Sequence, residues 1–287
     1  MAYRFIEKYH DIFGVRWLLK RLSIHPNAYY NYLKKRKEDY LNKKEHIHQT
    51  ITKIYHAHKG IPGYRMMRFY LKNEGIILSK LTVHKYMNQQ LNLKSITRKR
   101  KPNYKYGEAH KTFDNILNQN FSADKINIKW CTDFTYLFLE SGSKRYNCTI
   151  IDLHDRSVVA SITDDKITSA LAIRTINEAF SRQGITKADG IILHSDQGSQ
   201  FTSKEFTDFC DGAGITQSMS KAGYPYDNAP MERYFNTLKS ELIYQHEYKT
   251  EEELYSAISR YAYEEYNMKR PHTYNNGNTP FQARYSA

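Results

Sequence analysis

Residues 130–139 have the sequence WCTDFTYLFL, which is rich in β-branched and aromatic side chains. That composition predicts a β-strand. One acidic residue, Asp133, lies in the middle of the run. Because an Asp in a strand is commonly an edge or turn residue, Asp133 by itself indicates no particular function.

Two further acidic residues accompany Asp133. Asp196 follows the apolar run 191–193, within HSDQGSQF (194–201), and Glu232 opens a predicted helix within DNAPMERYFNTLK (227–239). Taken singly, Asp196 could belong to an ordinary loop, and Glu232 could be a first-turn carboxylate favoured by the helix dipole. If the three carboxylates converge, repulsion and desolvation raise their pKa values. Divalent metal removes that conflict, and two hard cations on shared carboxylates suit attack on a phosphodiester.

The residues around the three carboxylates form a specific pattern. The segments WxxDFTY (130–136), HSDxGxQF (194–201) and DNAxxExxFxxxKxE (227–241) resemble the signature of DDE transposases and retroviral-type integrases. Within that group the chain is similar to the second-frame product of the bacterial insertion-sequence family that uses two overlapping frames. The 35 residues between Asp196 and Glu232, the position of Lys239 and the closing YNxxRPH (266–272) all fit. The resemblance covers nearly the whole chain.

The resemblance implies a fold and a reaction. The fold is an α/β ribonuclease-H-like catalytic domain, with a mixed five-stranded sheet and helices, preceded by all-α helix-turn-helix DNA-binding units. Asp133, Asp196 and Glu232 would be catalytic and would hold two Mg²⁺ ions, with Mn²⁺ able to substitute. Water would release a 3′-OH at the end of the element, and this 3′-OH would attack a second phosphodiester. The residues alone indicate only metal-dependent phosphodiester chemistry; strand transfer is implied by the resemblance.

The predicted helix after residue 227 carries more than Glu232. Glu232, Asn236 and Lys239 share one helical face, with Arg233 beside them. The resemblance implies that Lys239 binds a phosphate near the scissile bond. The alternative is a salt-bridged face that makes no DNA contact. Asp227 and Asn228 are expected to cap this helix. Gly198 either allows a close backbone approach to metal or DNA, or is an ordinary turn glycine.

Charge is divided unevenly along the chain. The formal net charge is +13, from 43 Lys and Arg against 30 Asp and Glu. Residues 1–110 hold 24 basic and 7 acidic residues, whereas residues 111–287 hold 19 and 23. A basic first part followed by a slightly acidic second part indicates polyanion binding first and metal chemistry second. Nucleic acid is the expected partner.

The basic part predicts two helical units. Helices over 13–22 and 28–37, joined by a turn at 23–27, outline a helix-turn-helix. A second unit has helices over 45–58, 64–72 and 80–87, the last capped by Ser79 and a candidate recognition helix. The spacing from GYR (63–65) to this helix resembles the helix-turn-helix that precedes the catalytic domain in the same family. His46, His48, His56 and His58 suggest zinc, but no cysteine precedes Cys131, so surface histidines are expected.

A set of polar side chains, most of them basic, is expected to contact DNA. They lie on the second helical unit, in the basic run 96–105 and on the helix of Glu232: Arg65, Lys80, Lys85, Arg98, Lys99, Arg100, Lys101, Arg233, Asn236 and Lys239. The basic run has no apolar periodicity, as in a linker that tracks phosphates.

The pattern changes to strands from about residue 121. Strands are predicted over 129–139, 145–152, 156–163, 191–194 and 215–218, and helices over 169–180, 203–212, 228–244 and 250–267. We therefore divide the chain into a helix-turn-helix-like unit (1–42), a second helix-turn-helix unit (43–95), a basic linker (96–120) and an integrase/transposase catalytic domain (121–287).

Compartment and partners follow from the same features. No stretch is long and apolar enough for a membrane span, and the charged start lacks a signal peptide's apolar segment. Cys131, Cys148 and Cys210 are widely spaced, and the first two are expected to be buried thiols. The expected compartment is the bacterial cytoplasm, in association with the nucleoid. The expected partners are terminal inverted repeats, target DNA, further copies of the chain, and a first-frame protein or frameshift fusion.

Two other functions are considered. A stand-alone nuclease or junction resolvase would not need the long basic amino-terminal half. A DNA-binding regulator with a degenerate catalytic domain would not need acidic residues at all three positions. Transposition is therefore preferred.

Overall fold

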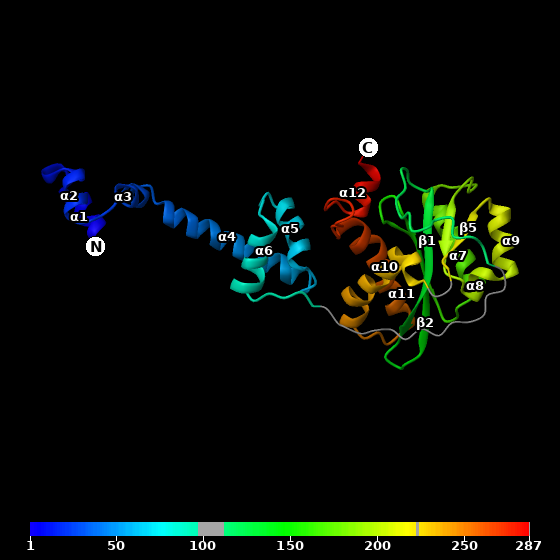
Figure 1. The fold of residues 1–287 in the computed structure, drawn as a ribbon. Helices are drawn as coiled ribbons and strands as arrows, with labels where there is room; N and C mark the ends of the chain where they lie inside the picture. Colours follow the sequence, from blue (N-terminus) through cyan, green and yellow to red (C-terminus); the bar gives the residue numbers. More distant parts are fainter. Residues whose placement is uncertain (97–111, 222–223, 287) are drawn as a thin grey trace. The chain divides into compact units, whose positions relative to one another are not determined.

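The chain forms two compact units. The computed structural model describes residues 1–96, 112–221 and 224–286, and it divides into Met1–Ser95 and Ile96–Ala287 (Figure 1). The two units are described separately below. None of the helices within the described ranges has the length and apolar character needed to cross a membrane.

The first unit begins with three short helices. They are α1 (Ala2–Phe13), α2 (Val15–Arg21) and α3 (Pro26–Leu33). Gly14 separates α1 from α2. Its φ of +76° is a backbone conformation that favours glycine. The three helices bury a small apolar core, made of Ile6, Leu18, Leu19 and Tyr29. The helix predicted over 13–22 corresponds to α2, whereas α1 was not predicted.

The rest of the first unit is a helical array. It contains α4 (Arg36–Ala57), α5 (Tyr64–Asn73), α6 (Lys80–His84) and η1 (Lys85–Gln90), which continues α6. The predicted helix over 28–37 ends at Leu33, and α4 runs unbroken through residues 42 and 43. The helices pack through a shared apolar core, made of Ile47, Ile51, Met67, Leu71, Val83 and Met87.

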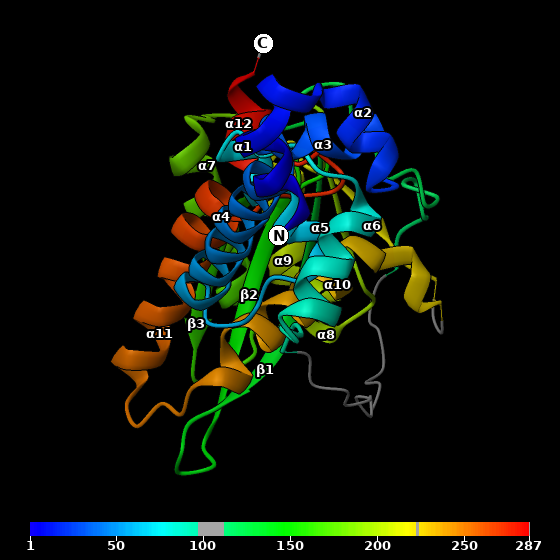
Figure 2. The ribbon, with the colours of Figure 1, turned by 90° about the vertical axis from the view of Figure 1, so that its left-hand side faces the viewer.

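The second unit is built on a mixed five-stranded sheet. Its strands are β1 (Lys129–Phe138), β2 (Lys144–Asp152), β3 (Val158–Asp164), β4 (Ile192–Ser195) and β5 (Thr216–Met219). Their order is β3-β2-β1-β4-β5. The first three strands pair antiparallel, and β4 and β5 run parallel to β1. The turn that joins β1 to β2 projects from the sheet (Figure 2). The five predicted strands and the ribonuclease-H-like fold are confirmed.

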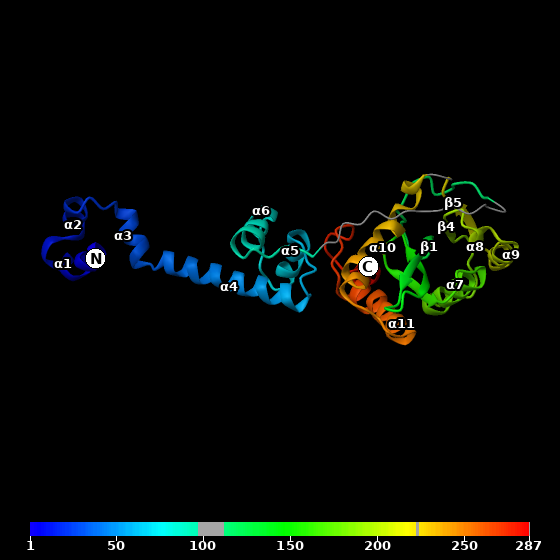
Figure 3. The ribbon, with the colours of Figure 1, turned by 90° about the horizontal axis from the view of Figure 1, so that it is seen from below.

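Helices cover both faces of the sheet (Figure 3). On one face lie α7 (Ser169–Gln183), α8 (Ser199–Thr202) and α9 (Lys204–Ala213); on the other lie α10 (Ala229–Glu241), α11 (Glu251–Arg260) and η4 (Tyr261–Lys269). Neighbouring residues of β1 point to opposite faces, as a pleated strand requires. Trp130 packs with the α7 side and Cys131 with the α10 side. All three cysteines are free and buried.

Three short helices complete the second unit. They are η2 (Pro225–Asn228), η3 (Ile243–Gln245) and α12 (Pro280–Tyr285). Arg284 on α12 donates hydrogen bonds to Asp155 at 2.6 Å and Asp152 at 3.2 Å, and all three side chains are buried. Helix α12 was not predicted, although its capping box between Thr279 and Gln282 is a recognised sequence signal. The buried ion pairs fasten the end of the fold to the β2–β3 turn.

Candidate active site

Strand register brings Asp133 and Asp196 to the same level of the sheet. In the parallel β1–β4 ladder Cys131 pairs with His194. Asp133 and Asp196 each lie two residues further along, so both side chains extend from the face that carries Cys131. Adjacent strands are about 4.8 Å apart. The two carboxylates are therefore neighbours on the α10 side of the sheet.

Helix α10 adds Glu232 to the same region. Cys131 on β1 lies in the same buried core as Met231 and Tyr234 of α10, which holds the helix over this face of the sheet. The Nδ2 of Asn228 donates a 3.3 Å hydrogen bond to the carbonyl oxygen of Thr132, next to Asp133 in β1. Asn228 precedes α10 and makes no side-chain capping bond. Asn228 thus occupies the N-cap position of α10, as predicted, but its amide bonds the sheet and not the first turn of the helix.

Burial disfavours the charged form of all three carboxylates, and at Asp133 the charges of the other two add to this effect. The pKa of Asp133 is raised well above its ordinary value, first by burial and then by the charges of Asp196 and Glu232. A 2.7 Å hydrogen bond from the Phe134 N–H acts in the opposite direction. Burial also raises the pKa of Asp196 and of Glu232. Such a cluster is stabilised by a nearby cation.

One loop glycine shapes the surroundings of Asp196. The Gly198 N–H donates a 2.9 Å hydrogen bond to Asp196 Oδ1. A Cβ atom at position 198 would lie 2.9 Å from that same oxygen, closer than a Cβ contact allows. Gly198 thus lets the loop fold back tightly onto the Asp196 carboxylate.

Lys239 lies near the carboxylates without pairing with one. Burial lowers the pKa of Lys239, and the charge of Asp133 opposes that effect. Within the described part of the chain, Lys239 has no carboxylate oxygen within ion-pair distance, Glu232 included. The alternative of a Glu232–Lys239 salt bridge is therefore absent from this structure. Arg233 and Asn236 are exposed on the same helix.

The carboxylate oxygens of Asp133, Asp196 and Glu232 suit a divalent cation by their chemistry, but the three groups are too far apart to bind one ion together. Carboxylate oxygens are the ligands that Mg²⁺ prefers. Across residues 1–96, 112–221 and 224–286, no three His, Cys, Asp or Glu side chains are close enough together to hold one ion. Asp133 and Asp196 thus provide a pair of neighbouring oxygen donors, and a third ligand requires movement of a side chain such as Glu232.

A buried polar cluster supports the site from behind β4. His194 in β4 accepts or donates hydrogen bonds at 2.9 Å to Ser218 and at 3.0 Å to Ser220. Burial lowers the pKa of His194 to about 4, so the imidazole is neutral at physiological pH. These contacts join β4, the strand that leads into Asp196, to the end of β5. The sequence gives no sign of this cluster, because serine and histidine in strands have no distinctive spacing.

Asp227 fastens the segment before α10. Its carboxylate accepts hydrogen bonds from Asn115 at 3.0 Å, Gln119 at 2.8 Å and the Lys221 N–H at 3.1 Å. The pKa of Asp227 is lowered by these hydrogen bonds, against the effect of burial. The prediction that Asp227 caps α10 is wrong, since its oxygens accept hydrogen bonds from Asn115, Gln119 and Lys221 and from no N–H of the helix.

Glu241 fastens the other end of α10. It pairs with Arg270 at 2.9 Å and accepts a 2.7 Å hydrogen bond from the Tyr261 hydroxyl. Both partners belong to the closing part of the chain, so Glu241 and Arg270 of the recognised pattern hold α10 against η4. This pair is structural.

The basic residues predicted on the helical unit are available to a ligand. Arg65, Lys80 and Lys85 are exposed on α5, α6 and η1. Arg98, Lys99, Arg100 and Lys101 lie outside the described residues.

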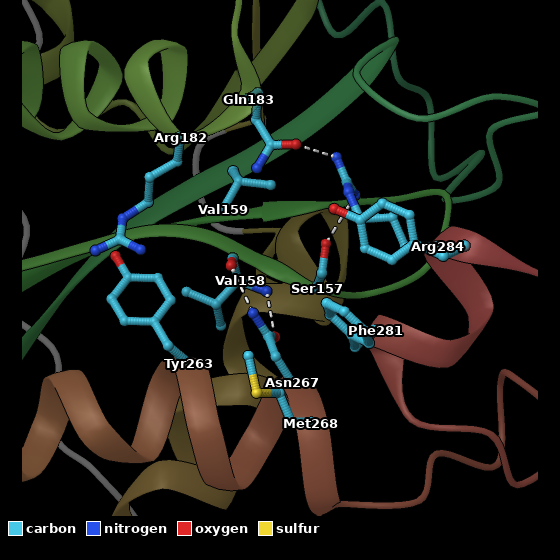
Figure 4. A pocket seen from close by; sticks show the side chains of 11 residues that line it. Ser157, Val158, Val159, Arg182, Gln183, Tyr263, Asn267, Met268, Phe281 and Arg284 are labelled. Carbon is cyan, nitrogen blue, oxygen red and sulfur yellow. Dashed lines mark hydrogen bonds between the residues drawn. The ribbon is translucent and has the colours of Figure 1, made fainter.

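A cavity of about 200 Å³ lies elsewhere in the second unit. It is bordered by the start of β3, the end of α7, η4 and α12 (Figure 4). Asn267 uses both groups of its amide on Val158, at 2.9 Å each, and the Arg182 guanidinium lies 3.8 Å above the Tyr263 ring. The cavity contains none of the three predicted catalytic carboxylates.

The order of the five strands and the helices on both faces of the sheet define the class of fold, a ribonuclease-H-like domain. Models of an integrase core domain match residues 123–225 and 213–280, and a model of an HTH-like domain matches residues 42–101. The chain is 31% identical to the transposase for insertion sequence element IS904 of Lactococcus lactis, over 80% of this chain and 90% of that protein. It is 32% identical to InsK of IS150 from Escherichia coli, over 93% and 92%. Identity to the transposase InsF for IS3A of Escherichia coli is 26%, over 98% of both chains.

The chain belongs to the insertion-sequence transposases, and the resemblance drawn from its motifs is confirmed. Similar solved structures include the simian T-cell lymphotropic virus intasome in complex with PP2A regulatory subunit B56 gamma, with a TM-score of 0.49 and 18% identity over 77% of this chain and 71% of that one. The HTLV-2 integrase catalytic core domain in complex with magnesium gives a TM-score of 0.44 and 20% identity, over 56% and 99%.

Proposed function

We propose that Asp133, Asp196 and Glu232 are the catalytic, metal-binding residues of this transposase. The enzyme would cut DNA at the ends of its insertion sequence and join the released 3′-OH to target DNA. The observation that carries this proposal is the β1–β4 register, because it makes Asp133 and Asp196 neighbours on the face covered by α10. The raised pKa of Asp133 supports a cation there, since its neighbours Asp196 and Glu232 are both acidic.

Each residue has a distinct role in this proposal. Bound Mg²⁺, or Mn²⁺ in its place, would supply activation of the attacking oxygen and stabilisation of the departing 3′ oxygen, with two ions expected. Asp133 is held by its strand, and Asp196 by the strand end and Gly198. Glu232 lies on a helix and can approach the pair by changing its rotamer. Lys239, free of a carboxylate partner among the described residues, would bind a phosphate beside the scissile bond, with Arg233 and Asn236 nearby.

The helical units would bind double-stranded DNA. The second helical unit, residues 43–95, would recognise the terminal inverted repeats through Arg65, Lys80 and Lys85, and the helical unit at 1–42 would add contacts. The basic run at 96–105 would track phosphates towards the catalytic domain at 121–287. The predicted linker bounds of 96–120 are too wide, because Leu117 is buried in the core beneath α10 and Asn115 and Gln119 bind Asp227. This division rests on the charge distribution and on the HTH-like match over residues 42–101.

The transposase would act as an assembly of several chains on the bacterial nucleoid. Two ends of one element must be processed together, so further copies of the chain are expected on the DNA. A first-frame protein, separate or fused by frameshifting, remains a prediction from the motifs, as does action on the nucleoid in the bacterial cytoplasm.

The decisive experiment measures Mg²⁺-dependent cutting and joining of element-end DNA. Asp133→Asn, Asp196→Asn and Glu232→Gln should each abolish both activities while binding to the same DNA is retained. The matched control is Asp189→Asn, because Asp189 is an exposed aspartate paired only with Lys187. Near-normal cutting by any one of the three variants would remove that residue from the catalytic set.

A further inference from the structure

One face of the second helical unit combines three kinds of exposed side chain. Leu81 on α6 is 83% exposed, and Lys85 and Gln89, at successive steps of four residues along α6 and η1, are exposed beside it. We call Leu81, Lys85 and Gln89 the reading face. Residues four apart lie on the same side of a helix. The face therefore offers an apolar, a cationic and an amide group in one row.

The opposite side of the same helix fixes its orientation. Val83 and Met87 are fully buried in the core that α4 and α5 also line. The Ser79 hydroxyl accepts a 3.1 Å hydrogen bond from the Thr82 N–H at the start of α6. Arg68 on α5 donates a 3.2 Å hydrogen bond to the Leu78 carbonyl and holds the connecting turn. The reading face is thus presented by a helix packed on a core.

The surroundings identify the partner as a polyanion. Residues 43–95 contain 10 Lys and Arg and 2 Asp and Glu. Helices α5 and α6 are joined by residues 74–79, a longer turn than the three or four residues of the simplest helix-turn-helix. In such motifs the second helix enters the major groove. Double-stranded DNA is therefore the occupant that this charge and this arrangement favour.

The major groove contains only one apolar group, the C5-methyl of thymine. Lysine suits guanine or phosphate, and glutamine suits the edge of adenine. An isolated exposed leucine is ordinary on a protein surface. Leu81 differs because it stands on the outward face of the second helix of a basic helix-turn-helix. We propose that Leu81 contacts a thymine methyl group in the terminal repeat and so helps to select the DNA sequence. This inference rests on the proposed function of the helical unit.

The test replaces thymines of the element's terminal repeat, one at a time, by deoxyuridine, which lacks only the methyl group. Binding of the full chain to each duplex is measured at fixed salt. At one or two positions deoxyuridine should weaken wild-type binding by about fourfold, the effect of one buried methyl group. Leu81→Ala should bind the thymine duplex more weakly and be insensitive to deoxyuridine at those same positions.

Ile77→Ala is the matched control. Ile77 is also aliphatic and is 82% exposed, but it lies in the turn before α6. This variant should keep the wild-type response to deoxyuridine. If the wild type binds the repeat selectively and no deoxyuridine position matters, or if Leu81→Ala keeps the same sensitive positions, the role of Leu81 is wrong and the proposed function stands. If the wild type binds the repeat no better than random DNA, the proposed recognition by this unit fails as well.

Discussion

Asp133 occupies a position where a carboxylate is costly without a cation. It lies within a strand covered by α10, and two other acidic residues raise its pKa. The hydrogen bond from Phe134 offsets this only in part. Residues that break the local rules of stability are commonly those retained for function. Stability and catalysis are therefore expected to respond in opposite directions when Asp133 is changed.

Asp133→Asn should stabilise the metal-free protein at neutral pH. Removing the charge relieves repulsion from Asp196 and Glu232, and a gain of about 1 kcal/mol raises Tm by roughly 2–4 °C in a domain of this size. Mg²⁺ should raise the Tm of the wild type and have little effect on the variant. Thermal unfolding with and without Mg²⁺ measures both effects. A variant less stable than the metal-free wild type would contradict this account.

The stabilisation by Asp133→Asn should depend on pH in a defined direction. A raised folded-state pKa means that the folded wild type binds the Asp133 proton more tightly than the unfolded chain does. Wild-type stability from this group is therefore lost as pH rises from the unfolded value near 3.9 through the raised pKa. The Tm difference between variant and wild type should be largest near pH 7 and should close towards pH 4. Buried His194 and His272, whose pKa values burial lowers to about 4 and about 3, destabilise both proteins in acid and cancel in this difference.

Lys239→Ala should separate positioning from metal binding. A charge-assisted hydrogen bond to phosphate is worth about 1.5–3 kcal/mol, so cleavage should fall by roughly ten- to a hundredfold. Metal affinity and folding should hardly change, because Lys239 has no carboxylate partner in the described residues. Lys239→Arg should recover part of the activity. Weaker Mg²⁺ binding or a lower Tm in Lys239→Ala would instead make the lysine a structural partner of the carboxylates.

At the residue scale, the motifs predicted that Asp133 and Asp196 lie close together, whereas local capping rules gave the wrong hydrogen-bond partners for Asp227 and Asn228. Asp227 and Asn228 have the right type and position for helix caps, yet Asp227 binds Asn115 and Gln119, and Asn228 binds Thr132. Capping is a local signal, whereas these partners are about 100 residues away along the chain. The neighbouring placement of Asp133 and Asp196 depends on the β1–β4 register, which no single strand specifies.

Helix α10 can act in catalysis only if it keeps its place on β1. Asn228 provides a direct polar link, from its Nδ2 to the carbonyl of Thr132. Asn228→Ala should therefore move Glu232 relative to Asp133. Loss of a hydrogen bond of about 0.5–1.5 kcal/mol predicts a fall in kcat of up to about tenfold, with DNA affinity nearly unchanged. Thr237→Ala is the control, since the Thr237 hydroxyl bonds only the Arg233 carbonyl of its own helix. Equal effects of both variants would exclude a specific role for Asn228.

Whole elements were predictable where a buried stripe recurs and turns are marked. The five strands and α5, α7 and α9 have such patterns. Helix α12 has six residues, of which only Pro280 is buried, so it is too short to show a repeating pattern of apolar residues. The boundary at 42–43 was placed between two predicted helices, but α4 continues through it, because its charged residues 36–46 include good helix formers such as Lys and Glu. Composition alone could not distinguish a solvated helix from a loop.

At the scale of the whole molecule, the uneven charge should appear in the salt dependence of DNA binding. Each phosphate neutralised by a lysine contributes about 0.9 to the slope of log affinity against log salt. Lys85→Ala should reduce that slope by about 1. Lys166→Ala, an exposed lysine of the catalytic unit, should leave it unchanged. Titrations of terminal-repeat DNA at several salt concentrations measure both slopes, and identical slopes for the two variants would contradict a special role for the helical unit.

Arg284 holds α12 against the β2–β3 turn through two buried ion pairs. Arg284→Met would leave Asp152 and Asp155 buried without their cation, and removing one partner of a buried pair costs about 3–5 kcal/mol. Denaturant unfolding should detect this loss. Arg260→Met, which removes an exposed pair with Glu264, should cost less than about 1 kcal/mol. Similar losses in both variants would mean that the buried pairs contribute little.

The same ion pairs set an order of events during translation. The partners of Arg284 are already synthesised 129 residues earlier, at Asp155, and the sheet around them can pair as soon as its strands leave the ribosome. Until residue 284 emerges, however, these two acidic side chains have no guanidinium to bury with. The nascent catalytic unit should therefore remain loosely folded until its final helix is released. The buried ion pairs of Asp152 and Asp155 can therefore form only after α12 has been synthesised, whatever the order in which the strands pair.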